Sequence, residues 1–325
     1  MVARLSMPIG SRQWPEIVSV LSKQTKAASE RSLCIWRLSD GKPGHESQSL
    51  GLVKALGELG AIKVVDYACP ATPWWPLWFL LKRIPNPPNA SPPDVLIAAG
   101  HRTHWAALTL KRLHGAFTTV LMRPSLPLCC FDIVVAPVHD GLIGARVIAT
   151  QGALNAMRPS IKCSDSTLLL VGGPSKHFIW SDADVLRQIA RLAERHPELQ
   201  VTNSRRTPEM LTVQLEAMFG SRFTPWQNCP PVWLADQLGR TEQVWVSEDS
   251  VSMIYESLSA GCRVGLLRLQ RPERPSRLVR GIDALVAEQR VGRWSETGPL
   301  DRLPANPGLQ EAARVASMLW QRFKQ

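Results

Sequence analysis

Paired cysteines, long apolar runs and a surplus of acidic residues are all missing from this sequence, and each absence excludes a class of protein. The seven cysteines include no Cys-x-x-Cys pair, which argues against a structural zinc site and against a disulfide framework. Several of them lie in apolar runs, which favours reduced, buried thiols in a cytosolic setting. The most apolar stretch, from Trp74 to Leu81, is far shorter than the roughly 20 residues of a membrane-spanning helix.

The composition that is present is basic but otherwise ordinary. Lys and Arg number 38 against 27 Asp and Glu, a formal charge of +11, so the surface should attract phosphates or acidic lipids. The basic residues are scattered and accompany no zinc-finger, RNP or helix-turn-helix signature, so nucleic acid is not an expected partner. Apolar residues make up 45% and charged residues 20% of the chain, the usage of a globular protein.

Residues 1–32 form a basic, serine-containing extension that lacks the apolar segment of a secretory signal. A mitochondrial presequence, a disordered extension and an upstream start codon all account for this bias. The extension is therefore set apart from the folded domains.

The rest of the chain alternates short apolar runs with loops and helical patterns, as parallel sheets with crossover helices do. Its length of 325 residues suits two domains. We expect the strands of a first Rossmann-like domain, residues 33–160, at 33–38, 62–65, 94–99, 117–122 and 132–136. We expect those of a second, residues 161–305, at 167–171, 199–202, 243–246 and 264–269. Residues 306–325 should form a C-terminal helix that crosses back to the first domain. The predicted fold class is α/β, with two Rossmann-like domains that face a central cleft.

Ligands of open α/β sheets bind beyond the carboxyl ends of the strands, where the loop at 39–45 of the first domain falls. It places Asp40, Lys42 and His45 beside two glycines. His45 could be the general base for an acceptor hydroxyl because the unperturbed pKa of histidine lies near neutrality, with Asp40 as the reserve. The alternative is that His45 only begins the following helix. Arg102, in a later loop at this edge, could hold an anionic acceptor.

In the second domain, the segment from Ser247 to Glu256 indicates a helix that begins near Ser250 and turns one polar face outward. Free N–H groups at its start suit a diphosphate, and Ser250 and Ser252 could add hydroxyl donors. Glu256, one turn deeper, could accept hydrogen bonds from both ribose hydroxyls. The alternative is that Ser250 or Asp249 only caps the helix and that Glu256 is a solvated acid.

Two further loops of the second domain could approach a nucleotide. Gly172 and Gly173 follow a predicted strand and allow close approach of the backbone, and Lys176 could balance phosphate charge. Arg205 and Arg206 could grip diphosphate oxygens from the next loop. A simple tight turn and a solvated charge pair are the respective alternatives.

Three tryptophans, Trp74, Trp75 and Trp78, precede a Lys-Arg pair. This pattern suits insertion at a lipid interface, so we expect peripheral membrane contact through these side chains. A buried tryptophan cluster under a surface loop is the alternative.

Several of these segments resemble the ELM family, named for plant mitochondrial fission proteins, whose bacterial members are described as glycosyltransferases. The resemblance covers about residues 33–270 and rests on SDGKPGHESQSLGL, AAGHRTHWAAL, VGGPSKHFIW, VTNSRRTP and VSEDSVSMIYESLSAG. The last phrase is also similar to the donor-site segment of GT-B enzymes such as MurG. Departures from the family pattern occur at Ser257 and Cys262.

The resemblance implies a GT-B fold and residue roles that complete the predicted site. Its nucleotide-sugar part comprises Gly172, Gly173, Ser175, Lys176, Arg205, Arg206, Ser250, Ser252, Met253 and Glu256. Its acceptor part comprises Gly41, Lys42, Gly44 and Arg102, with His45 and Asp40 as the catalytic pair. We expect neither a metal nor another cofactor, because GT-B enzymes use helix dipoles and basic side chains on the leaving group.

We therefore predict a glycosyltransferase that moves a sugar from a nucleotide diphosphate to a lipid or lipopolysaccharide-core acceptor at a membrane surface. The expected location is the cytoplasm, peripheral on the inner membrane, or the mitochondrial surface in a eukaryote. Plant members of the family are described as recruiting a dynamin-related protein. The alternative is therefore a non-catalytic, membrane-peripheral adaptor on the same fold.

Overall fold

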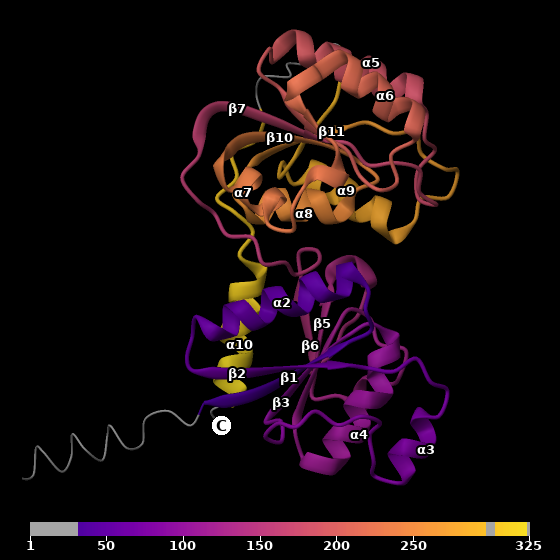
Figure 1. The fold of residues 1–325 in the computed structure, drawn as a ribbon, viewed down its shortest axis with the longest axis vertical. Helices are drawn as coiled ribbons and strands as arrows, with labels where there is room; N and C mark the ends of the chain where they lie inside the picture. The colour runs from indigo at the N-terminus through magenta and orange to yellow at the C-terminus, as the bar shows by residue number, and fades with distance from the viewer. Residues whose placement is uncertain (1–31, 297–302, 324–325) are drawn as a thin grey trace, which may run out of the picture.

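The protein consists of two α/β domains, shown in Figure 1 in a computed structural model that describes residues 32–296 and 303–323. The predicted extension over residues 1–32 therefore lies outside the described residues except for Ser32. Each domain contains one six-stranded sheet, and every strand pair is parallel.

The first sheet has the strand order β2-β1-β3-β4-β5-β6. Its strands are β1 (Leu33–Ser39), β2 (Ile62–Ala68), β3 (Val95–Ala99), β4 (Phe117–Leu121), β5 (Ile133–Pro137) and β6 (Val147–Thr150). The continuous apolar runs of β3 and β5 are buried along their whole length, as expected for central strands covered on both faces. Helix α2 (Pro43–Gly57) packs on one face, and α3 (Trp75–Leu80) and α4 (His104–His114) pack on the other.

The second sheet has the order β12-β11-β10-β7-β8-β9. Its strands are β7 (Cys163–Leu170), β8 (Gln200–Thr202), β9 (Phe223–Thr224), β10 (Thr241–Ser247), β11 (Arg263–Leu267) and β12 (Gly292–Arg293). Helices α5 (Asp182–Arg195) and α6 (Glu209–Phe219) cover one face, and α7 (Trp233–Arg240), α8 (Val251–Ser259) and α9 (Arg277–Ala287) cover the face toward the first domain (Figure 1).

The C-terminal helix α10 (Glu311–Phe323) lies against α2 in the first domain, where Figure 1 draws it in yellow. Val315 and Leu319 of this helix are fully buried there, and a Cβ at Gly60 would overlap the Trp320 ring. The domains also meet where the Asn155 side-chain amide donates to Ser259 Oγ at 3.0 Å. Two Rossmann-like domains with a returning terminal helix form the GT-B arrangement, so the predicted fold class is confirmed.

The cysteines agree only partly with the expectation of buried thiols. Cys34, Cys69 and Cys262 are buried, whereas Cys129 and Cys163 are exposed, and none forms a disulfide in the part of the chain described. Cys129 lies in a surface turn and Cys163 is the first residue of β7. An apolar neighbourhood in the sequence therefore did not guarantee burial.

The tryptophan-rich segment is divided between core and surface. Trp75 is 4% exposed and its indole N–H donates to the carbonyl oxygen of Pro70 at 3.2 Å, so the predicted membrane contact through Trp75 is wrong. Trp78 packs against the same core, and only Trp74, at 63% exposed, is open to solvent. Within the described ranges, no helix combines the length and apolar character needed to cross a membrane.

Candidate functional site

At the carboxyl edge of the first sheet, Asp40 in the loop after β1 and His45 in the first turn of α2 form a carboxylate–imidazole pair. His45 thus lies at the beginning of the helix, as its alternative interpretation had it, and also contacts Asp40. His45 Nδ1 lies 2.9 Å and 3.0 Å from the two carboxylate oxygens of Asp40, whose side chain is buried. Burial opposes ionisation of Asp40, but hydrogen bonds from His45 and the backbone N–H of Lys42 hold its pKa below the ordinary value. A carboxylate on Nδ1 leaves Nε2 as the proton acceptor, which is the arrangement of a general base.

Gly100, at the end of β3, allows this pair to lie against the neighbouring loop. Its φ is +93°, and a Cβ there would overlap His45 Nδ1 and lie 2.7 Å from Asp40 Oδ2. Only glycine meets both the backbone and the steric requirement. The loop after β3 is therefore shaped around the Asp40–His45 pair.

Arg102, a predicted acceptor residue, lies near the Asp40–His45 pair at this edge. Burial raises the pKa of the Cys69 thiol to about 12, and the charges of Asp40 and Arg102 also act on it, so Arg102 lies in the same neighbourhood. Burial lowers the pKa of His104 to about 4, which keeps that ring neutral beside Ser125 Oγ at 2.9 Å. Gly41 in the loop and Gly44 in the first turn of α2 are exposed, and a Cβ on either would meet no atom within 4 Å. Their assignment to the acceptor stays a prediction.

In the second domain, α8 begins without a side-chain cap. The N–H groups of Val251, Ser252 and Met253 donate no hydrogen bond within the described residues. The predicted alternative, in which Ser250 or Asp249 caps this helix, is therefore not what forms. Unused N–H groups at the positive end of a helix suit an anion.

A cavity of about 440 Å³ opens at this helix start. Five predicted site residues line it: Arg205, Arg206, Ser250, Ser252 and Met253. Arg205 is exposed and has no ion-pair partner in the described part of the chain. The remaining wall comes from β8, the following loops and α7: Thr202, Asn203, Ser204, Trp226, Cys229, Trp233 and Leu234.

The glycine turn after β7 is held by Asp249. The N–H of Gly173 donates to Asp249 Oδ2 at 3.0 Å, and Arg206 Nη2 donates to the same oxygen at 2.7 Å. A Cβ on Gly172 would overlap both Asp249 and Ser250 Oγ. Gly172, Gly173, Arg206 and Ser250 are thus brought together, but around a carboxylate of the chain itself.

Ser175 and Lys176 lie further along the same turn. Ser175 Oγ accepts a hydrogen bond from the N–H of His177 at 3.3 Å, and the Lys176 side chain is exposed. Neither hydrogen-bonds to the Asp249 cluster within the described residues. Their assignment to the nucleotide stays a prediction.

Glu256 on α8 is a desolvated carboxylate. Burial raises its pKa to about 7, and no side chain in the described ranges hydrogen-bonds or ion-pairs with it. The residue is half-buried, and its assignment to a ribose stays a prediction. A desolvated carboxylate with no partner among the described residues is suited to a ligand that supplies hydroxyl donors.

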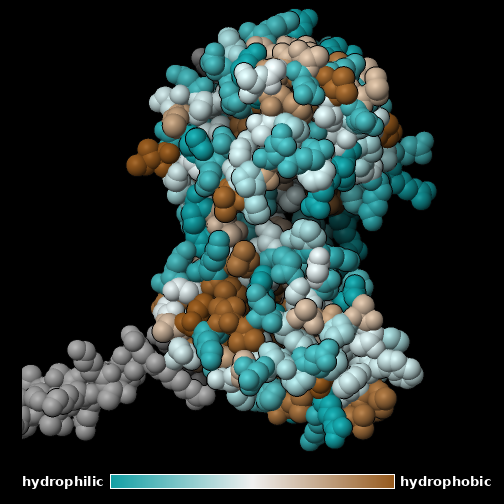
Figure 2. Space-filling view, viewed as in Figure 1, coloured by the Kyte–Doolittle hydropathy of each residue, from teal (hydrophilic) through white to brown (hydrophobic). Residues whose placement is uncertain are grey.

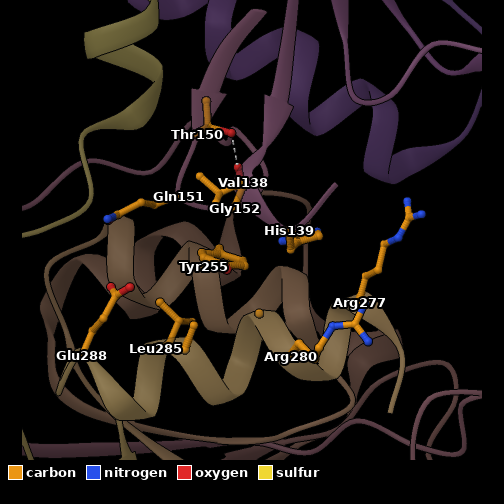
Figure 3. Close-up of a pocket in the computed structure, with 12 residues that line it drawn as sticks. Val138, His139, Thr150, Gln151, Gly152, Tyr255, Arg277, Arg280, Leu285 and Glu288 are labelled. Atoms are coloured by element: carbon orange, nitrogen blue, oxygen red, sulfur yellow. Dashed lines mark hydrogen bonds between the residues drawn. The ribbon is translucent and has the colours of Figure 1, made fainter. Parts of the chain in front are cut away.

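A second cavity, of about 230 Å³, lies between the domains beside α8. Figure 3 shows the strand ends of the first domain on one side and α8 and α9 on the other. Tyr255 forms its floor, Gly152 lies on the Tyr255 ring, and Arg277 and Arg280 come from the start of α9. Sequence reasoning missed both arginines because a Pro- and Arg-rich stretch precedes α9 and no helix was expected there.

The same reasoning missed Trp226 and Trp233 as cavity walls and Asp249 as the anchor of the glycine turn. Trp226 follows the two-residue strand β9, which has too little pattern to detect. An Asp directly before a predicted helix start is itself a signal, but it is read first as a cap.

No cluster of His, Cys, Asp and Glu that could hold a metal ion occurs in the portion that the structure describes.

The sequence profile described as "Mitochondrial fission ELM1" matches residues 43–323. The uncharacterized protein RP120 of Rickettsia prowazekii is 27% identical over 291 aligned residues, which cover 70% of this chain and 81% of that protein.

Two solved structures are reported for comparison. MurG of Acinetobacter baumannii has 13% identity and a TM-score of 0.45, with 90% of this chain and 91% of that chain covered. A UDP-GlcNAc 2-epimerase of Neisseria meningitidis bound to UDP-GlcNAc has 11% identity and a TM-score of 0.45, with 89% and 91% covered.

Proposed function

This chain belongs to the mitochondrial fission ELM1 family, and we propose that it is a glycosyltransferase that uses a nucleotide-diphosphate sugar. The donor binds in the second domain, and the acceptor hydroxyl meets the Asp40–His45 pair of the first domain. The acceptor is a lipid or a lipopolysaccharide-core sugar at a membrane surface.

The observation that carries this proposal is the cavity at the start of α8. Beside it lie the backbone N–H groups of Val251, Ser252 and Met253, the Ser252 hydroxyl and the Arg205 guanidinium, none of which has a hydrogen-bond or ion-pair partner among the described residues. These are the donors that a diphosphate requires. The Ser250 hydroxyl already donates to Asp249 Oδ2 at 3.0 Å. Trp226 and Trp233 supply apolar walls on which a nucleobase can pack. Glu256 does not line this cavity but lies one turn further along α8, where we propose that it accepts hydrogen bonds from ribose hydroxyls.

In the transfer step, His45 Nε2 accepts the proton of the acceptor hydroxyl while Asp40 holds the ring through Nδ1. The acceptor oxygen forms a bond to the anomeric carbon, and the bond from that carbon to the diphosphate oxygen breaks. The leaving diphosphate takes the bonding electrons, and the α8 N–H groups and Arg205 stabilise its charge.

The α3 region supports an acceptor at a membrane surface. Exposed fractions are 63% for Trp74, 67% for Leu80 and 59% for Leu81, and Lys82 and Arg83 follow directly. Figure 2 shows hydrophobic side chains at the base of the lower domain, where α3 lies in Figure 1. An apolar tip beside basic residues suits peripheral contact with an anionic bilayer.

A non-catalytic adaptor is a second candidate, favoured by the Asp249 cluster. Asp249 already receives the Gly173 N–H and the Arg206 guanidinium, so part of the predicted phosphate site is occupied by the chain itself. In that case the fold would serve recruitment of a protein partner, such as a dynamin-related protein, at the membrane.

A transfer assay separates the two candidates. Purified protein is incubated with bacterial membranes and radiolabelled UDP-, GDP-, CMP- or ADP-sugars, and label in the lipid fraction is counted. The proposal expects transfer with one nucleotide class, and His45→Ala should lower it by about 10²–10⁴-fold. The matched control is His114→Ala, an exposed histidine at the end of α4. No transfer by the wild-type protein would favour the adaptor.

A further inference from the structure

Two arginines line the interdomain cavity and have no acidic partner among the described residues. Arg277 and Arg280 line this cavity of about 230 Å³ from the first turn of α9. Within the described residues, the Arg277 side chain makes no hydrogen bond or ion pair, and the Arg280 side chain donates only to the carbonyl oxygen of Pro275 at 3.1 Å. Figure 3 shows these two side chains and His139 at one end of the cavity, with Glu288 at the other.

Three other arginines of the second domain, Arg206, Arg271 and Arg293, differ in this respect. Arg206 lies 2.7 Å from Asp249, and both Arg271 and Arg293 ion-pair with the buried Glu248 at 3.0 Å and 2.7 Å. Their charges are neutralised inside the protein. The charges of Arg277 and Arg280 remain available to a ligand, and two guanidinium groups one turn apart favour a carboxylate or a phosphate.

The rest of the cavity suits a sugar ring. Its volume is below the roughly 300–1,000 Å³ of pockets for drug-sized ligands, so it fits a single compact unit. The Tyr255 ring gives an apolar floor, and burial raises the pKa of its hydroxyl to about 12, so the hydroxyl stays protonated and can donate. Gln151 and Glu288 at the other end offer partners for sugar hydroxyls.

The cavity also joins the two domains. Gly152 of the first domain has a φ of +86°, and a Cβ there would overlap the ring of Tyr255. Tyr255 in turn precedes Glu256 on α8. A molecule in this cavity therefore touches both domains.

We propose that this cavity binds an acidic monosaccharide unit, in which Arg277 and Arg280 hold a carboxylate or a phosphate. The role of this unit as the transferred or the accepting sugar rests on the proposed glycosyl transfer. The binding of the anion itself can be tested without turnover.

The test is a ligand-observed NMR titration of the full-length protein with three probes: glucose 6-phosphate, glucuronate and uncharged glucose. At least one of the two anions should bind saturably and glucose should not, and the two anions distinguish phosphate from carboxylate. The double variant Arg277→Gln, Arg280→Gln should weaken that binding by about tenfold or more. The control is Arg274→Gln, which also removes one positive charge. Arg274 precedes α9 and does not line the cavity, so this variant should leave binding unchanged.

Equal binding of glucose and the anions, no binding of either anion, or an unchanged affinity in the double variant would each overturn the inference. Thermal melting of each variant verifies that it is folded. Titration with UDP, GDP, CMP and ADP separates this result from the proposed function. Nucleotide binding without anion binding removes only the acidic sugar, whereas anion binding without nucleotide binding removes the nucleotide-dependent transfer.

Discussion

Replacing Glu256 by Gln should stabilise the second domain in a pH-dependent way. Burial raises the pKa of Glu256 from 4.5 to about 7. The wild-type carboxyl is therefore most favourable to folding below pH 4.5, and that contribution is lost as pH rises through about 7. Gln does not ionise, so it avoids the loss, which reaches about 3 kcal/mol at about pH 8 and is below about 1 kcal/mol at about pH 5.

Urea denaturation at about pH 5 and about pH 8, followed by circular dichroism, measures this difference. Glu216→Gln is the matched control, because Glu216 is exposed on α6 and should behave as wild type at both values. Nucleotide binding should change in the opposite sense: the Gln variant should bind more weakly by roughly 1–3 kcal/mol above pH 7 because the ribose hydroxyls lose a charged acceptor. An equal stability difference between variant and wild type at both pH values would refute the assigned burial of Glu256.

Three further predictions concern the first domain. His45→Ala should leave nucleotide affinity unchanged while lowering turnover, and a proportional loss of both would contradict its role as base. Gly100→Ala should lower the free energy of unfolding and abolish transfer, because the added Cβ overlaps His45. The control is Gly115→Ala: Gly115 also has a positive φ, but no atom lies within 4 Å of the added Cβ. This variant should show only the backbone cost of about 1–3 kcal/mol. Leu80→Glu with Leu81→Glu should reduce co-flotation with anionic vesicles, and unchanged flotation would remove α3 as the membrane contact.

The long buried strands could be predicted from the sequence because each is a continuous apolar run. β3 and β5 start within a residue of the expected positions. The edge strands β6, β9 and β12 escaped because they have four, two and two residues and no such run. Their pairing depends on a neighbouring strand that is distant in sequence.

Adjacent tryptophans illustrate what composition does not determine. Trp74 and Trp75 have the same side chain, yet one is 63% and the other 4% exposed. The difference arises from the short helix α3, which turns one of them into the core against Pro70. Helix phase, and not residue type, decides which of them can reach a membrane.

The site was predictable where it depended on local spacing and not where it depended on distant partners. Asp40 and His45 are five positions apart, so the sequence placed both at this edge, whereas their hydrogen bond was found only in the structure. Asp249 meets Gly173 and Arg206 across 76 and 43 positions of the chain, and no local pattern reveals such contacts. Likewise, the cavity of Tyr255 and Arg280 exists only because the two domains meet there.

The binding of a nucleotide at the start of α8 is the central claim, and calorimetric titration of the purified protein with UDP, GDP, CMP and ADP forms tests it most directly. We expect saturable binding of one nucleotide class, which Ser252→Ala and Glu256→Gln each weaken. No binding across the panel, or an unchanged Kd in both variants, would contradict it.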